Sequence, residues 1–152
     1  MVLQALVAEV RDLSESEAGN WVVRLMAIAD GLDRELADPA ELAALADRLI
    51  DVAETVGARS VTGASAGGDR LAGAMAVRSA GRVRLVDGAS TNDPILVVET
   101  LLATGTQLLA TARTLRAGGV GRVVGAAVLA DPTALELARR ELGDQVVALE
   151  VI

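Results

Sequence analysis

The residues best suited to chemistry lie in one stretch, 95–107, where an apolar run is followed by an acid and then by a turn of small residues. The branched apolar residues 95–98 lead directly into Glu99 and Thr100, and a helical pattern begins after the turn. The turn consists of Ala103, Thr104, Gly105, Thr106 and Gln107. Because a helix N-terminus offers free backbone N–H groups and the positive end of the helix dipole, such a turn attracts anions, phosphate above all. The stretch predicts a carboxylate beside a phosphate-binding turn.

A second turn of small residues lies earlier in the chain and is a candidate for the same ligand. A short strand pattern at 61–64 leads through Ser65 into Ala66, Gly67 and Gly68, and a helical pattern follows. Glycine lets a backbone approach a ligand or another backbone closely. Each turn also has a plain structural interpretation, because small residues often join a strand to a helix in α/β proteins. Both interpretations are kept for both turns.

The elements that must hold these turns are strands and helices that alternate after residue 58. A continuous apolar run without alternation indicates a strand buried on both faces, as in a parallel sheet. Strand patterns occur at 61–64, 83–86, 95–99, 122–129 and 145–152, and helical patterns separate most of them. We predict a single domain, 1–152, of the α/β class: a mostly parallel central sheet flanked by helices at 58–152, preceded by a helical part at 1–57.

One connection does not fit a simple parallel sheet. The strands at 82–86 and 95–99 are joined by about eight residues with no helical pattern, whereas parallel neighbours normally need a dozen or more. Either the chain returns across the sheet in an extended form, or the two strands pair as an antiparallel hairpin. The sequence leaves both arrangements open.

Three helical patterns make up the N-terminal part. The apolar stripe of residues 1–13 predicts a helix suited to docking or dimer formation. A second helix, 14–36, starts at a capping box and should bury an apolar face, which consists of Val22, Leu25, Met26, Ala29 and Leu32. The third helix begins at Asp38, with Pro39 at its first position, and stops at Gly57.

Composition excludes several kinds of chemistry. The chain of 152 residues has no Cys and no His, and all 14 cationic residues are Arg, so thiolate metal sites, disulfides, an imidazole base and a catalytic amine are all absent. A net charge of −7 argues against nucleic acid or an acidic membrane as a partner. No apolar run is long enough to span a bilayer and no signal peptide is evident, so we expect a cytoplasmic protein. Trp21, the only aromatic residue, is interpreted as a core or interface residue.

The two turns resemble those of type I phosphoribosyltransferases, and the resemblance covers residues 58–130. The 95–107 stretch is similar to the family's phosphoribosyl-pyrophosphate loop, which has four apolar residues, two acids, two apolar residues and then Thr-Thr-Gly-Gly-Thr. The 63–72 stretch looks like the family's pyrophosphate-binding loop, a Gly-Gly turn between a strand and a helix. The resemblance implies the family's fold and a phosphorylated ribose or nucleotide as ligand. It implies Mg²⁺ only if phosphoribosyl pyrophosphate is bound, and it makes a homodimer the expected oligomer.

The loop departs from the family pattern at the ribose and at the phosphate. In the family, two adjacent acids lie against the ribose hydroxyls; Glu99 keeps the first position and Thr100 replaces the second. Binding of the ribose diol, and of the Mg²⁺ around it, should weaken because Thr100 offers a hydroxyl without a charge. Thr106 stands in place of a Gly and adds a side chain where the backbone approaches the ligand.

The lid is the larger departure. Family enzymes carry a long flexible loop that closes over the site and often supplies a catalytic Lys or Arg. The matching region here is only 87–94, which contains no cation. Arg70 and Arg84 are nearby candidates, and both also fit ordinary solvated charges on a helix and at a strand end. Without a lid, water is not excluded from the transition state and the leaving pyrophosphate is not neutralised.

Three hypotheses follow. The first is a degenerate, non-catalytic member that binds a phosphorylated ligand at 103–107 weakly or not at all and acts as a regulatory or assembly partner. The second is an active phosphoribosyltransferase whose lid and cations come from a partner chain, with Glu99 as the ribose contact. The third is a homo-oligomeric scaffold that uses residues 1–13 and Trp21 as its interface.

Overall fold

A parallel sheet forms the centre of the computed structural model, which describes residues 3–9, 21–86, 92–143 and 145–152. Within these residues the sheet has five strands in the order β2-β1-β3-β4-β5, and every neighbouring pair is parallel. The strands are β1 (Ser60–Gly63), β2 (Arg84–Leu85), β3 (Ile95–Leu102), β4 (Val123–Ala130) and β5 (Val146–Val151). The predicted α/β class and parallel sheet are therefore confirmed.

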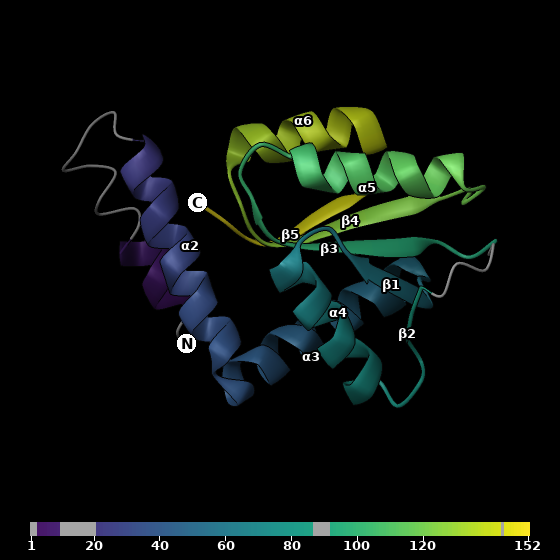
Figure 1. Ribbon diagram of the computed structural model, residues 1–152, viewed down its shortest axis with the longest axis horizontal. Coiled ribbons are helices and arrows are strands. Elements are labelled where there is room, and N and C mark those ends of the chain that lie inside the picture. Colours follow the sequence, from purple (N-terminus) through teal and green to yellow (C-terminus); the bar gives the residue numbers. More distant parts are fainter. Residues whose placement is uncertain (1–2, 10–20, 87–91, 144) are drawn as a thin grey trace.

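Helices cover both faces of the sheet (Figure 1). The labelled helices are α2 (Trp21–Ala37), α3 (Pro39–Val56), α4 (Ala66–Arg78), α5 (Thr106–Ala117) and α6 (Pro132–Leu142). Figure 1 shows α5 and α6 on one face and α3 and α4 on the other, with α2 beside the end of the sheet. Residues 3–9 add a further helical segment next to α2. None of the described helices is both long and apolar enough to cross a membrane.

Two apolar cores lie on opposite faces of the sheet. One holds side chains of segment 3–9, α2, α3 and α4 against one face, and the other holds α5 and α6 against the opposite face. All eight residues of β4 are buried, which explains its unbroken run of small and branched apolar residues. Small residues bring layers close together: a Cβ on Gly125 would lie 3.0 Å from the Cδ2 of Leu108 on α5.

The start and end of α3 follow the sequence signals. Asp38 caps the helix by accepting hydrogen bonds from the amides of Ala40, at 2.8 Å, and Glu41, at 3.3 Å. Gly57 ends it with a φ of 74°, in the left-handed region that glycine adopts without strain. Both boundaries of this helix were predictable because each depends on residues adjacent in sequence.

Two predictions about the N-terminal part need correction. Leu32 is buried as predicted, but Met26 is 62% exposed and Ala29 is also exposed, because α2 turns Ile28 and Leu36 inward instead. The apolar stripe of the first helix is not free for docking in its described part, since Leu3, Leu6 and Val7 are buried in the chain's own core; the stripe beyond residue 9 lies outside the described residues. Ser14 and the side chain of Trp21 also lie outside them.

The order of the strands decides whether β2 and β3 form a hairpin. β2 is an edge strand that pairs with β1 in parallel, and β1 lies between β2 and β3. β2 and β3 are therefore not neighbours and the hairpin is excluded, while the connection between them lies partly outside the described residues. Strand β2 is also shorter than the predicted 83–86, with only two residues on the ladder.

Leu6 packs over Gly31 so closely that this glycine should not tolerate a side chain. A Cβ on Gly31 would lie 2.3 Å from Leu6 Cδ1, whereas a Cβ on Gly73 of α4 would meet nothing within 4 Å. Gly73→Ala should raise the free energy of unfolding by about 0.5–1 kcal/mol, because Ala is the better helix former. The free energy of unfolding of Gly31→Ala should be about 1–3 kcal/mol lower than that of Gly73→Ala, because Leu6 of segment 3–9 must shift. Urea denaturation measures both, and equal stability of the two variants would contradict this packing.

Candidate functional site

The candidate site lies where the chain divides between the two faces of the sheet. After β1 the chain enters α4 on one face, and after β3, its neighbour, it enters α5 on the other (Figure 1). The carboxyl ends of β1 and β3 are therefore left open to a ligand, and open α/β sheets bind ligands at such a switch point. Both turns identified in the sequence follow these two strands. The topology thus brings the two segments together.

Glu99 connects the two turns. Its side chain is 4% exposed, and its Oε1 accepts a hydrogen bond of 2.6 Å from the Ser65 hydroxyl and one of 2.9 Å from the amide of Thr100. The Ser65 hydroxyl also accepts a hydrogen bond of 3.1 Å from the amide of Gly68, which caps α4. A buried carboxylate needs such donors to offset the loss of water. The end of β3 is therefore tied to the start of α4 through one acid.

The turn 103–107 forms a small pocket with Glu99. The pocket has a volume of about 120 Å³ and is lined by Glu99 and by residues 101–108, so the structure brings together all the turn residues singled out in the sequence. Drug-sized ligands occupy ~300–1,000 Å³. A pocket of this size matches one compact group, such as a phosphate, and not a whole nucleotide.

The backbone of the turn is arranged for an anion. Gly105 is the N-cap of α5 with a φ of 81°, and as a glycine it has no side chain to cap the helix. The two hydroxyls of the turn face each other, with 3.0 Å between Thr104 Oγ1 and Thr106 Oγ1, and the Thr106 amide donates to Thr104 Oγ1 at 3.3 Å. An uncapped helix N-terminus leaves amide donors available to a negatively charged group. The turn can supply amides, hydroxyls and the helix dipole.

The Gly67–Gly68 turn has a clear packing role. A Cβ on Gly68 would lie 2.2 Å from the Val98 carbonyl oxygen, and one on Gly67 would lie 2.7 Å from Thr100 Cγ2. The start of α4 therefore touches β3 directly, which accounts for both glycines without any ligand. Ala66 is exposed beside them. Ligand binding by Ala66, Gly67 and Gly68 stays a prediction.

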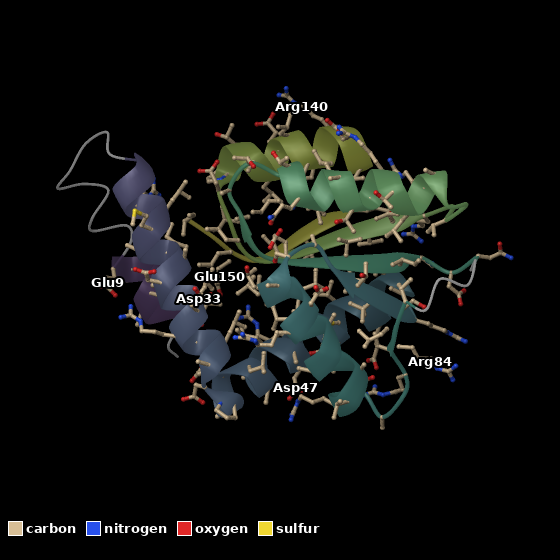
Figure 2. The ribbon with its side chains drawn as sticks, in the orientation of Figure 1. Glu9, Asp33, Asp47, Arg84, Arg140 and Glu150 are labelled. Carbon is tan, nitrogen blue, oxygen red and sulfur yellow. The ribbon has the colours of Figure 1, made fainter. Side chains whose placement is uncertain are left out.

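The cations do not join the site. Arg84 pairs in register with Ser60, which is level with Ile95 at the start of β3. Glu99 comes four residues later, roughly 13 Å further along the strand. Figure 2 shows Arg84 and Glu150 at opposite ends of the sheet. Arg70 is exposed and lines a different surface pocket, with Pro39 and Leu42. The suggestion that Arg84 lies near the site is therefore wrong.

Two polar residues were missed in the sequence, Ser65 at this site and Glu35 in a separate part of the fold. Ser65 was noted only as part of a turn, although a Ser directly before a helical pattern is a typical N-cap. Glu35 was not noted at all, although it interrupts the apolar positions of α2 and is 3% exposed in the structure. Among the described residues, no group of three or more Asp or Glu side chains is arranged to hold a metal ion.

No protein-family model matches the sequence, and no curated protein matches it significantly. Solved structures are similar in fold. An APRTase from Giardia lamblia complexed with 9-deazaadenine aligns with a TM-score of 0.63 and 17% identity, over 79% of this chain and 84% of that one. A phosphoribosyltransferase from Corynebacterium diphtheriae aligns with a TM-score of 0.67 and 19% identity, over 79% and 80% of the two chains.

An orotate phosphoribosyltransferase from Mycobacterium tuberculosis, in complex with inorganic phosphate, aligns with a TM-score of 0.65 and 23% identity, over 79% of this chain and 76% of that one. The fold is therefore that of the type I phosphoribosyltransferases, as the resemblance of the two turns implied. Sequence identity at this level supports a similarity of fold alone.

The hydroxyl of Ser65 should contribute more to the free energy of unfolding than an exposed hydroxyl within a helix. Ser65→Ala removes the cap of α4 and a donor to a buried carboxylate, so we expect the free energy of unfolding to fall by about 2–3 kcal/mol. Thr55→Ala is the control, because the exposed Thr55 hydroxyl bonds only to the Asp51 carbonyl within α3. That variant should change stability by less than about 0.5 kcal/mol. Equal losses in the two variants, measured by urea denaturation, would contradict the role given to Ser65.

Proposed function

We propose that this protein binds the phosphate group of a phosphorylated ribose or nucleotide at the turn 103–107, weakly and without turnover, and that it serves as a regulatory or assembly partner. The observation that carries the proposal is the small pocket in which Glu99 stands beside the uncapped start of α5. Solved proteins of the same fold are named as phosphoribosyltransferases, and one of them is in complex with inorganic phosphate. This supports the same class of ligand.

Weak ribose binding follows from what Glu99 already does. Its Oε1 accepts bonds from Ser65 and from the Thr100 amide, so part of its hydrogen-bonding capacity is used within the fold. The hydroxyl of Thr100 lies 3.5 Å from the same oxygen, and its methyl group packs over Gly67. A ribose diol would meet one partly engaged carboxylate and no second acid from the neighbouring residue.

The absence of turnover follows from the charges. Charge that develops on a leaving pyrophosphate needs cationic or metal stabilisation aimed at it. No Arg is among the described residues that line the pocket, and the connection 87–94 contains none in its sequence. Magnesium enters the proposal only with phosphoribosyl pyrophosphate. In the described part of the chain, Glu99 is the one carboxylate that lines the pocket, and Mg²⁺ is usually held by one or two carboxylates together with substrate phosphates.

The first test is a thermal-shift titration with phosphoribosyl pyrophosphate, with and without Mg²⁺, against a 5′-nucleotide and inorganic phosphate. A ligand at 100 times its dissociation constant stabilises the fold by about 2.7 kcal/mol. We expect saturable stabilisation by the phosphorylated compounds and no pyrophosphate release with any common base. Turnover that disappears in Glu99→Ala would overturn the non-catalytic part of the proposal and favour an active transferase.

The position of the site is tested with two matched glycine variants. Gly105 and Gly119 both have a positive φ, at 81° and 99°, so Val strains the backbone at either position. Gly119 follows α5 at its far end, away from the pocket. Gly105→Val should abolish the ligand-induced shift, whereas Gly119→Val should lower the melting temperature and keep the shift. A Gly105→Val protein that binds ligand unchanged would remove the site from this turn.

A further inference from the structure

Glu35 is a buried acid that the proposed function does not use. It lies on α2 with 3% of its surface exposed, and neither of its carboxylate oxygens has a hydrogen-bond partner among the described residues. Glu99, also buried, has two close donors. Burying an unpaired carboxylate costs several kcal/mol, and proteins normally pair such a group or bind something to it. Glu35 therefore calls for a partner.

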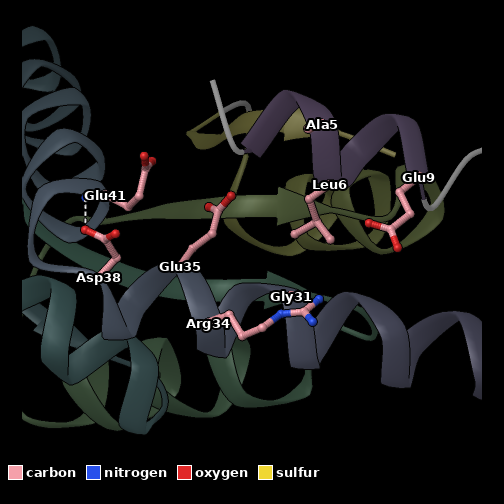
Figure 3. Close-up of a pocket in the computed structure, with 8 residues that line it drawn as sticks. All are labelled: Ala5, Leu6, Glu9, Gly31, Arg34, Glu35, Asp38 and Glu41. Carbon is pink, nitrogen blue, oxygen red and sulfur yellow. Dashed lines mark hydrogen bonds between the residues drawn. The ribbon is translucent and has the colours of Figure 1, made fainter.

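A pocket surrounds this carboxylate. It lies between segment 3–9 and α2, reaches the start of α3 and has a volume of about 330 Å³. Its lining residues are Ala5, Leu6, Glu9, Gly31, Arg34, Glu35, Asp38 and Glu41 (Figure 3). Segment 3–9 and Gly31 give it an apolar wall, and acids from all three helical elements give it its charge. A volume near the lower end of known ligand pockets suits a small molecule.

The charges of the lining do not balance. Among the described residues, four carboxylates line the pocket against one guanidinium, that of Arg34. Figure 3 shows the Arg34 side chain extending along α2 toward Gly31, while Glu35 points to the opposite side, between Glu41 and Leu6. Asp38 Oδ1 already caps α3 through the Ala40 amide at 2.8 Å. The described part of the lining consequently carries an excess of negative charge around Glu35.

The environment of Glu35 also affects its proton affinity. Burial raises the pKa of Glu35, and the nearby Glu41 carboxylate raises it further. Glu9, Asp38 and Arg34 are the other charged groups that line the same space. A cation bound beside Glu35 would favour its charged form and offset part of the penalty of burial.

We propose that this pocket binds a small organic cation, a primary ammonium or guanidinium group on a short apolar body, with Glu35 as its buried counter-ion. Leu6 and Ala5 would contact the apolar body, and Glu9 and Glu41 would attract the charge. A bare metal ion suits the pocket less well, because no cluster of metal-ligating side chains exists among the described residues. The site is separate from the turn 103–107, shares no lining residue with it, and does not depend on the function proposed above.

The test is calorimetric titration of the full chain with agmatine and with butylamine, with butanol as an uncharged probe of similar shape. Glu35→Gln keeps the shape of the side chain and removes its charge. Asp33→Asn is the matched control, because Asp33 is exposed on the same helix and does not line the pocket. We expect wild type and Asp33→Asn to bind both cations alike and to ignore butanol. Glu35→Gln should bind the cations at least about tenfold more weakly.

Amide NMR spectra of the same samples locate the binding. Changes induced by agmatine should centre on Ala5, Leu6, Gly31 and Glu41. The proposal is overturned by unchanged affinity in Glu35→Gln, by changes centred elsewhere, or by the lack of saturable binding of either cation at millimolar concentration. Because the turn 103–107 plays no part in cation binding, Gly105→Val should bind the cations as wild type does. The failure of one proposal is therefore distinguishable from the failure of the other.

The burial of Glu35 predicts that the stability of the fold depends on pH. A carboxyl whose pKa is raised by folding stabilises the fold fully below its unfolded pKa, near 4.5 here, and this contribution is lost as the pH rises through the folded pKa. Without ligand, the melting temperature of wild type should therefore fall relative to that of Glu35→Gln as the pH rises from about 4.5 toward neutrality. A constant difference between the two proteins across this range would show that Glu35 is already paired.

Discussion

The direct contact between the start of α4 and strand β3 determines the geometry of the rest of the site. Only glycine fits at position 68, where a Cβ would lie 2.2 Å from the Val98 carbonyl oxygen. That contact sets Ser65 at a distance of 2.6 Å from Glu99, and Glu99 in turn lines the pocket at the start of α5. The turn 103–107 and the Gly67–Gly68 turn are thus connected through the buried carboxylate of Glu99. A packing constraint therefore also determines which polar groups remain available to a ligand.

The same fold places two buried acids in opposite circumstances. Glu99 is satisfied by Ser65 and the Thr100 amide, so it serves structure first and has limited capacity left for a ribose. Glu35 has no partner among the described residues and stands in a pocket with an excess of negative charge. Because unpaired buried charge is costly, the second acid indicates a ligand more directly than the first. The turn 103–107 and the pocket around Glu35 therefore suit ligands of opposite charge.

Local signals predicted local features, and tertiary packing decided the others. The caps of α3 at Asp38 and Gly57, and the buried strands β3 and β4, follow from neighbouring residues and unbroken apolar runs. The rotation of α2 was missed because Met26 and Ile28 are equally apolar, and only contact with other elements chooses between them. Arg84 was placed near the site because the register of the strands, which sets Arg84 level with the start of β3 and not with Glu99, is a tertiary feature. The partner of Glu99 was missed because it also depends on tertiary packing, since Ser65 is 34 residues away.

An amide NMR titration of the full chain with inorganic phosphate tests directly whether the turn 103–107 binds an anion. Phosphate carries the charge that the turn should recognise and lacks the ribose and base. We expect saturable changes that are largest at the amides of residues 104–107, with smaller changes at Glu99, which also lines the pocket, and at its neighbour Thr100. Changes confined to other regions of the chain, or none at millimolar phosphate, would contradict this expectation and would leave the fold without an anion site at this turn.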